Sequence, residues 1–133
     1  MIQTTQIDNL FSSLQNGCHA AIQRIIYPYS HLCHAILDIL QNDGYIRGYT
    51  LKVNQRKHIT EFEIFLKYVN NMPTFRKIQR ISTPGARIYF SIKRLHKLNN
   101  HLCLYILTTS KGLLSHKNAI RNNVGGEIIC KIT

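Results

Sequence analysis

The chain has 133 residues, with 17 Lys or Arg, 6 Asp or Glu and a net charge of +11. This length can bury one moderate core or two small ones, which argues against a multidomain enzyme. A hydrophobic fraction of 44% argues against a disordered basic tail, and no apolar run reaches the ~20 residues of a membrane span. We therefore expect a globular protein with a polyanionic partner, nucleic acid first and an anionic membrane second.

The first half of the chain carries the hydrophobic periods of two helices and three strands. Gly17 is placed to end the first helix, Ser30 to cap the second, and Gly44 to supply the left-handed position at its end. In the last strand, apolar residues alternate with polar ones that include Glu61 and Glu63. The predicted order is a helix over 7–14, a strand over 21–27, a helix between residues 30 and 44, and strands over 45–53 and 59–69.

The segment NNMP, residues 70–73, disfavours both helix and strand and predicts a boundary. We expect an N-terminal α+β subdomain over 1–70 and a C-terminal subdomain over 71–133 that is basic and mostly β. The elements expected in the second half are strands over 75–82, 86–92, 102–107 and 127–133, a turn at 83–85 and one short helix capped by Ser115.

Charge divides unevenly at this boundary. Residues 1–70 contain 6 Lys or Arg and 5 Asp or Glu, whereas residues 71–133 contain 11 and 1. The polyanion-binding surface is therefore expected in the second half.

Catalytic sites find little support. Only six carboxylates exist, and Glu61 and Glu63 share one polar strand face, where a solvated surface is the ordinary interpretation. The letters TSKG belong to a phosphate-binding loop, but no glycine precedes Lys111 at the required spacing. No flanking motif marks a Cys–His nucleophile pair. We expect no enzyme activity, no cofactor and no small-molecule substrate.

The four cysteines form no C-x-x-C pair, so neither a zinc ribbon nor a redox dithiol is indicated. His31, Cys33 and His34 are metal-ligating residue types close together, but no second pair follows at zinc spacing. We expect no metal site and mostly buried, reduced thiols.

The polar loop LTTSKGLLS, residues 107–115, is the first candidate binding site. Its hydroxyls can bond to ribose 2′-hydroxyls, phosphates and base edges in the shallow minor groove of an RNA helix. Lys111 adds a mobile charge for phosphate, and Gly112 permits a positive φ or a close backbone approach. The alternative is an ordinary exposed turn between strand and helix. The candidate hydroxyls are those of Thr108, Thr109 and Ser110, since Ser115 is expected to cap the helix that follows.

The segment RISTPGARIY, residues 80–89, is the second candidate. Pro84 and Gly85 fit the centre of a type II turn, with a positive φ at the glycine. Arg80, Arg87 and Tyr89 flank the turn, and arginine with an aromatic ring commonly serves phosphate contact and base stacking. The alternative is a hairpin with solvated arginines and a core tyrosine.

The basic stretch KRLHKL, residues 93–98, has two interpretations. The simpler is a solvated face with Leu95 and Leu98 pointing inward, and the other is direct RNA contact.

Three motifs in order, STPGARIY (82–89), LTTSKGLL (107–114) and GGEIICKI (125–132), resemble the small-subunit ribosomal protein eight family. The family patterns are close to S-[RK]-P-G-x-R-[IV]-Y, [ST]-T-[SP]-x-G-[ILV]-[ML] and G-G-E-[IVL]-x-C-x-[VI]. The opening of the family is matched as well, at Asp8, Asn16-Gly17, Pro28-x-Ser30 and Gly44-Tyr45-Ile46. The resemblance covers essentially the whole chain.

The resemblance implies a structural constituent of the small ribosomal subunit that binds the central domain of small-subunit rRNA and supports its folding and assembly. It implies an α+β fold of two packed subdomains, the first α-β-α-β-β and the second mainly β with one short helix. Its partners would be rRNA and other small-subunit proteins, protein five among them, and no membrane. Glu127 is implied to brace the loop. The implied RNA-binding residues are Thr108, Thr109, Ser110, Lys111, Gly112, Arg80, Ser82, Pro84, Gly85, Arg87 and Tyr89.

The chain departs from the bacterial pattern at several positions. The chain has Ser13 and Gln15 where the bacterial pattern usually has two arginines, and His31 and Cys33 where it has lysines. Thr83 replaces the basic residue that usually precedes the proline. The first ten residues also lack the features of a signal or transit peptide. We expect an organelle-encoded protein of the mitochondrial ribosome, with a plastid or a bacterial cytoplasm as alternatives.

A different class of function stays open. The same positive charge would suit a free regulator that binds a messenger RNA, or a peripheral binder of anionic membranes.

Overall fold

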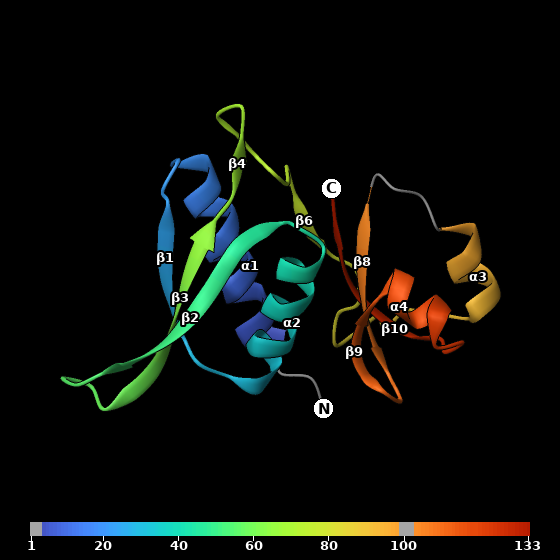
Figure 1. The fold of residues 1–133 in the computed structure, drawn as a ribbon. Helices are drawn as coiled ribbons and strands as arrows, with labels where there is room; N and C mark the ends of the chain where they lie inside the picture. Colours follow the sequence, from blue (N-terminus) through green and yellow to red (C-terminus); the bar gives the residue numbers. More distant parts are fainter. Residues whose placement is uncertain (1–3, 99–102) are drawn as a thin grey trace. The chain divides into compact units, whose positions relative to one another are not determined.

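The computed structural model describes residues 4–98 and 103–133. The chain forms two compact units, Met1–Arg76 and Lys77–Thr133. Each unit combines helices with antiparallel strands, so the predicted α+β class is confirmed (Figure 1).

The division falls after residue 76, whereas the boundary expected from the sequence falls after residue 70. Strands β4 (Tyr68–Val69) and β5 (Met72–Pro73) pair with each other across Asn70 and Asn71, which both adopt a positive φ. The hydroxyl of Thr74 then donates to the carbonyl of Tyr45 at 2.5 Å. NNMP is therefore a tight hairpin, and the chain beyond it still contacts the first unit.

The first unit is a three-stranded antiparallel sheet in the order β1-β3-β2. Helix α1 packs on β1, α2 packs on β2, and the two helices contact each other, so both cover the same face of the sheet (Figure 1). The order α-β-α-β-β is as predicted. Its elements are α1 (Thr4–His19), β1 (Arg24–Pro28), α2 (His31–Asn42), β2 (Ile46–Asn54) and β3 (Ile59–Leu66).

The local signals for the helices of this unit are mostly confirmed. The Ser30 hydroxyl accepts the backbone N–H of Cys33 at 3.1 Å, and Gly44 adopts φ +81°. The predicted end of α1 at Gly17 is wrong, because α1 continues to His19. A Cβ on Gly17 would stand 3.0 Å from side-chain atoms of Ile25 and Leu66, so this glycine permits close approach of helix and sheet.

Glu63 departs from the solvated face predicted for it. Its side chain is 5% exposed and pairs with Arg24 of β1, at 2.6 Å, and with Lys52 of β2. The bond from Lys52, followed by the one from Arg24, holds the pKa of the Glu63 carboxyl below its ordinary value against the effect of burial. The ion triad joins all three strands, and no sequence pattern on β3 alone could show it.

The second unit is built around the C-terminal strand β10 (Gly126–Ile132). Strand β10 pairs with β6 (Ile78–Arg80), β7 (Tyr89–Phe90) and β8 (Leu104–Thr109), and β8 pairs in turn with β9 (Gly112–Ser115). The strands expected over 75–82 and 86–92 are thus shorter than predicted. The strand expected over 102–107 extends to Thr109, and its first residue lies outside the described residues.

Two short helices, rather than the one expected, are found in the described part of this unit. Helix α4 (His116–Arg121) begins at the predicted cap, where the Ser115 hydroxyl accepts the N–H of Asn118 at 3.3 Å. Helix α3 (Ile92–Lys97) was not predicted and occupies most of the basic stretch KRLHKL. Packing stabilises so short a helix, because isolated helices of this length are unstable in water.

The core of the second unit lies between its helices and its sheet. Leu95 of α3 and Ala119 of α4 are fully buried together with Leu107 of β8 and Ile128 of β10. No helix in the described part of the chain has the length and apolar character to span a membrane.

Candidate nucleic-acid interface

The segment LTTSKGLLS is a β-hairpin rather than a loop. Thr108 pairs with Leu113 and Thr109 with Gly112, which leaves Ser110 and Lys111 as the two turn residues. The Thr109 hydroxyl donates to the Gly112 carbonyl at 2.8 Å and accepts the N–H of Lys111 at 3.1 Å. Gly112 adopts φ +100°, so of the two roles predicted for it, a positive φ or a close backbone approach, the first is observed. The loop expectation fails because Leu113 and Leu114 continue the strand pairing.

The three candidate hydroxyls of the hairpin, at Thr108, Thr109 and Ser110, differ in their exposure to a ligand. Ser110 is exposed beside Lys111 at the turn, and Thr109 is half-buried with its hydroxyl bonded within the turn. The Thr108 Oγ1 is buried and has no hydrogen-bond partner among the described residues. The turn itself is therefore the part of the hairpin most open to a ligand.

The two glycines of the G-G-E motif permit close backbone approach, Gly126 to the hairpin and Gly125 to the end of β7. A Cβ on Gly126 would overlap the carbonyl oxygen of Thr108, and one on Gly125 would stand 2.6 Å from the carbonyl oxygen of Phe90. Neither glycine was among the predicted site residues. The doubled glycine was the available signal, but only the strand pairing shows which backbone it admits.

Pro84 and Gly85 form the exposed centre of a two-residue turn. Thr83 and Ala86 exchange two backbone hydrogen bonds of 3.1 Å on either side of it. The positive φ predicted at Gly85 is wrong, because among the described glycines only Gly44 and Gly112 have one. The turn is therefore not of type II, and a proline at its first central position suits type I equally well.

Ser82, by contrast, is almost fully buried. Its hydroxyl accepts the N–H of Ile88 at 3.0 Å and donates to the carbonyl of Ile88 at 3.3 Å. Arg80 donates from Nε to the Ser82 carbonyl at 2.7 Å. These residues shape the segment beneath its exposed turn.

Tyr89, Glu127 and Thr108 lie in one row across three strands. Glu127 of β10 is paired with Tyr89 of β7 on one side and with Thr108 of β8 on the other. Directly opposed residues project from the same face of a sheet. Tyr89 is 64% exposed, so the alternative of a core tyrosine is wrong. The tertiary structure thus brings the two candidate segments together at Glu127.

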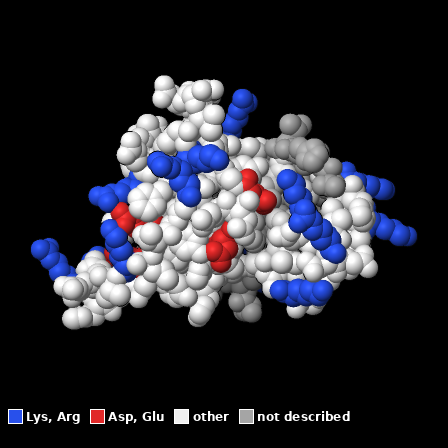
Figure 2. All heavy atoms as spheres, viewed as in Figure 1, with Lys and Arg blue, Asp and Glu red and all other residues white. Residues whose placement is uncertain are grey.

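The Glu127 carboxylate is nearly buried and is paired with the Arg87 guanidinium, whose Nη1 lies 3.3 Å from Oε1. Glu127 therefore connects to the hairpin through its backbone and to the turn segment through its side chain. Residues 77–133 contain ten Lys or Arg and no acidic residue besides Glu127. Figure 2 shows how sparse acidic side chains are among the basic ones on the face it displays.

The metal-ligating residue types of α2 do not converge. Cys33 is fully buried, whereas His31 is exposed. The Nε2 atom of His34 lies 3.7 Å from Oδ2 of Asp38, one turn further along the helix. Residues 4–98 and 103–133 contain no group of three or more His, Cys, Asp or Glu side chains that could hold a metal ion.

A strongly basic unit that exposes a lysine, a hydroxyl and an aromatic ring is typical of proteins that bind nucleic acid. Comparison with known proteins defines the family. The family model described as Ribosomal protein S8 matches residues 5–133, and the chain belongs to this family of small-subunit ribosomal proteins. The resemblance found in the sequence is confirmed.

Individual relatives are similar over nearly their whole length. The small ribosomal subunit protein uS8 of Ehrlichia chaffeensis is 45% identical over 126 residues, which cover 95% of each chain. The uS8 proteins of Caulobacter vibrioides and Agrobacterium fabrum are 38% and 37% identical over 132 residues, 99% of each chain.

Proposed function

We propose that this protein is a non-catalytic, structural constituent of the small ribosomal subunit that binds the central domain of small-subunit rRNA and supports its folding and assembly. The observation that carries the proposal is the row of Tyr89, Glu127 and Thr108, which joins the exposed hairpin turn to the exposed Pro84–Gly85 turn. Family membership supports the ribosomal setting.

In this proposal the exposed groups contact RNA directly. Ser110 and Tyr89 offer a hydroxyl and a stacking ring, and Lys111 supplies charge to a phosphate. Thr108, Thr109, Gly112, Pro84 and Gly85 form the rest of the contacting surface, mainly through backbone and turn shape. Arg80, Ser82, Arg87 and Glu127 hold these turns in position, and Glu127 is the brace.

Partners and location are further parts of the proposal. Neighbouring small-subunit proteins, protein five among them, would contact the protein in the assembled subunit. A mitochondrial ribosome is supported by the absence of Arg at residues 13 and 15 and of Lys at residue 31, where Ser, Gln and His stand. The relatives compared above are bacterial, and a bacterial cytoplasm fits them equally.

Two measurements test the proposal. The double substitution Thr109→Ala with Ser110→Ala should weaken binding to a central-domain rRNA fragment about tenfold, because it removes the exposed Ser110 hydroxyl and the Thr109 bonds that shape the turn. Sedimentation of native extract should show the protein comigrating with the small subunit. Unchanged affinity of the double variant would contradict the role of the turn, and a wholly soluble or membrane-bound pool would contradict the ribosomal role.

A further inference from the structure

Helix α3 presents a cationic face, formed by residues of the basic stretch KRLHKL, that is separate from the RNA-contacting residues proposed above. Successive helical residues are rotated by about 100°, so Lys93, Arg94 and Lys97 share an arc of about 100°. All three are exposed, whereas Leu95 on the opposite side is fully buried. The helix is thus amphipathic, with charge outward.

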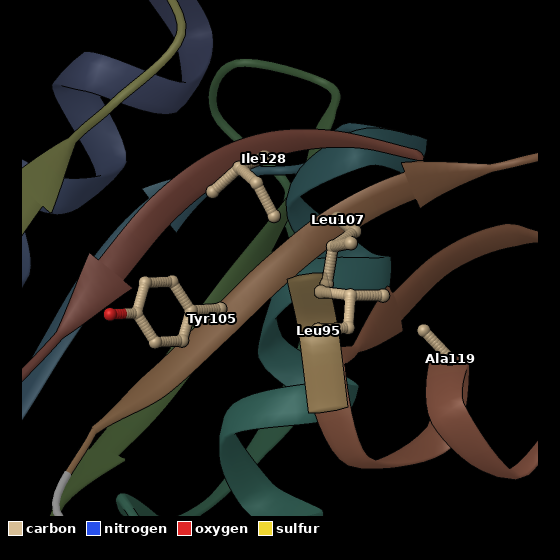
Figure 3. Packing of buried hydrophobic residues seen from close by; sticks show 5 residues of the cluster. All are labelled: Leu95, Tyr105, Leu107, Ala119 and Ile128. Carbon is tan, nitrogen blue, oxygen red and sulfur yellow. The ribbon is translucent and has the colours of Figure 1, made fainter. Parts of the chain in front are cut away.

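Helix α4 contacts α3 and is amphipathic in the same way, with one charged face and one buried face. Lys117 and Arg121 are exposed and stand four residues apart, so they share one face of the helix. Figure 3 shows Leu95 and Ala119 directed toward Leu107 of the sheet. The cations of both helices therefore project from the side that faces away from the sheet.

These five residues, Lys93, Arg94, Lys97, Lys117 and Arg121, form what we call the helical cationic surface. Figure 2 shows basic side chains projecting at the right-hand edge, where Figure 1 draws α3. The one carboxylate in the sequence of this unit, Glu127, is already paired with Arg87. Like charges on one surface repel one another, and a polyanion that neutralises them removes this repulsion.

Arg94 is held in place as well as charged. Its guanidinium carbon lies 4.0 Å from the centre of the Phe90 ring. Stacking on an aromatic face restricts the planar guanidinium but leaves its N–H edge available for a phosphate.

We infer that the helical cationic surface binds the phosphate backbone of an RNA duplex as a second contact, separate from the hairpin turn and independent of base sequence. This inference rests on the proposed function, since it places the duplex in the same rRNA. An anionic membrane is a poorer fit. A helix that binds a membrane surface inserts an apolar face, whereas Leu95 and Ala119 are fully buried and Ile120 packs against the same core.

The test compares three variants of the full chain. K93Q/R94Q/K97Q removes three charges from α3, R47Q/R56Q/K57Q removes three exposed charges from the first unit, and T109A/S110A alters the hairpin turn. Affinity is measured as a function of salt for a central-domain rRNA fragment and for an RNA duplex of unrelated sequence. Thermal melting by circular dichroism checks folding, and K93R/R94K/K97R retains the charge as a second control.

The α3 variant should reduce the magnitude of the slope of log affinity against log salt by about 2 to 3, at roughly 0.7 to 0.9 per phosphate contact. It should lower the affinity for both RNAs by the same factor. The charge-retaining variant K93R/R94K/K97R should show the salt slope of the native protein. The hairpin variant should lower the affinity for the rRNA fragment but not for the unrelated duplex. If the hairpin variant has no effect while the α3 variant behaves as expected, the proposed hairpin function fails and this inference stands.

An unchanged slope in the α3 variant would overturn the inference, as would an equal loss from the first-unit variant. Binding of the same variants to vesicles of phosphatidylcholine and phosphatidylglycerol is measured as well. Loss of vesicle binding with unchanged RNA binding would assign the surface to a membrane and overturn the inference as well.

Discussion

Thr108 and Gly126 lie so close on neighbouring strands that the carbonyl oxygen of Thr108 fills the space where a Cβ of residue 126 would stand. The contact joins backbone to backbone, so no side chain can rotate away to relieve an overlap. The position of the hairpin against β10 therefore depends on the absence of a side chain at residue 126.

Gly126→Ala should destabilise the second unit by about 2 to 4 kcal/mol, because the strands must separate or distort. Denaturant unfolding measures the change in the free energy of unfolding. Gly85→Ala is the matched control. A Cβ there meets no atom within 4 Å, so the change should stay within about 0.5 kcal/mol. Equal stabilities of the two variants would contradict the close approach.

The pair formed by Arg87 and Glu127 should show energetic coupling. Glu127 is nearly buried and Arg87 is partly buried, so removal of either partner leaves a poorly solvated charge. In a double-mutant cycle with Arg87→Gln and Glu127→Gln, we expect a coupling free energy of about 1 kcal/mol. Strict additivity of the two single changes would show that the ion pair does not stabilise the fold.

Glu63 should make the stability of the first unit dependent on pH. Its pKa is lowered in the folded state from the ordinary value of 4.5, so its contribution is present above that value and is lost as pH falls through the folded pKa. Glu63→Gln should therefore reduce stability at neutral pH, with the difference from the native protein shrinking in acid. Denaturant melts across this range measure the effect.

Glu61→Gln is the control for that experiment, because Glu61 lies on the same strand and its one described side-chain hydrogen bond, from the side-chain amide of Asn54, is long at 3.5 Å. We expect it to change stability little at any pH. A difference between native protein and Glu63→Gln that stays constant from neutral to acidic pH would refute the ion triad.

The thiol of Cys130 should be inert in the folded protein. Burial raises its pKa to about 12, an effect that outweighs the charge of nearby Arg80. Because the thiolate is the reactive form, iodoacetamide at neutral pH should label the partly exposed Cys103 before Cys130. Peptide mass spectrometry measures the order, and labelling of Cys130 at the same rate as Cys103 would contradict its burial.

Several features of the fold could be predicted because they depend on neighbours in the chain. Ser30 and Ser115 cap their helices through an N–H three residues away, and Gly44 takes the left-handed position that few other residues tolerate. The helical spacing of Ile7, Leu10 and their neighbours likewise predicted the buried face of α1. Family membership was also recognisable from short motifs.

Other features depended on contacts between distant parts of the chain and could not be predicted. Helix α3 is six residues long and exists because Leu95 has a core to enter. The burial of Glu63 requires cations from two other strands, and the row of Tyr89, Glu127 and Thr108 requires β10 to lie between β7 and β8. Capping bonds and hydrophobic periods act within a few residues and are written in the local sequence. The site arises from strand register between segments far apart in the chain, which only the packed core determines.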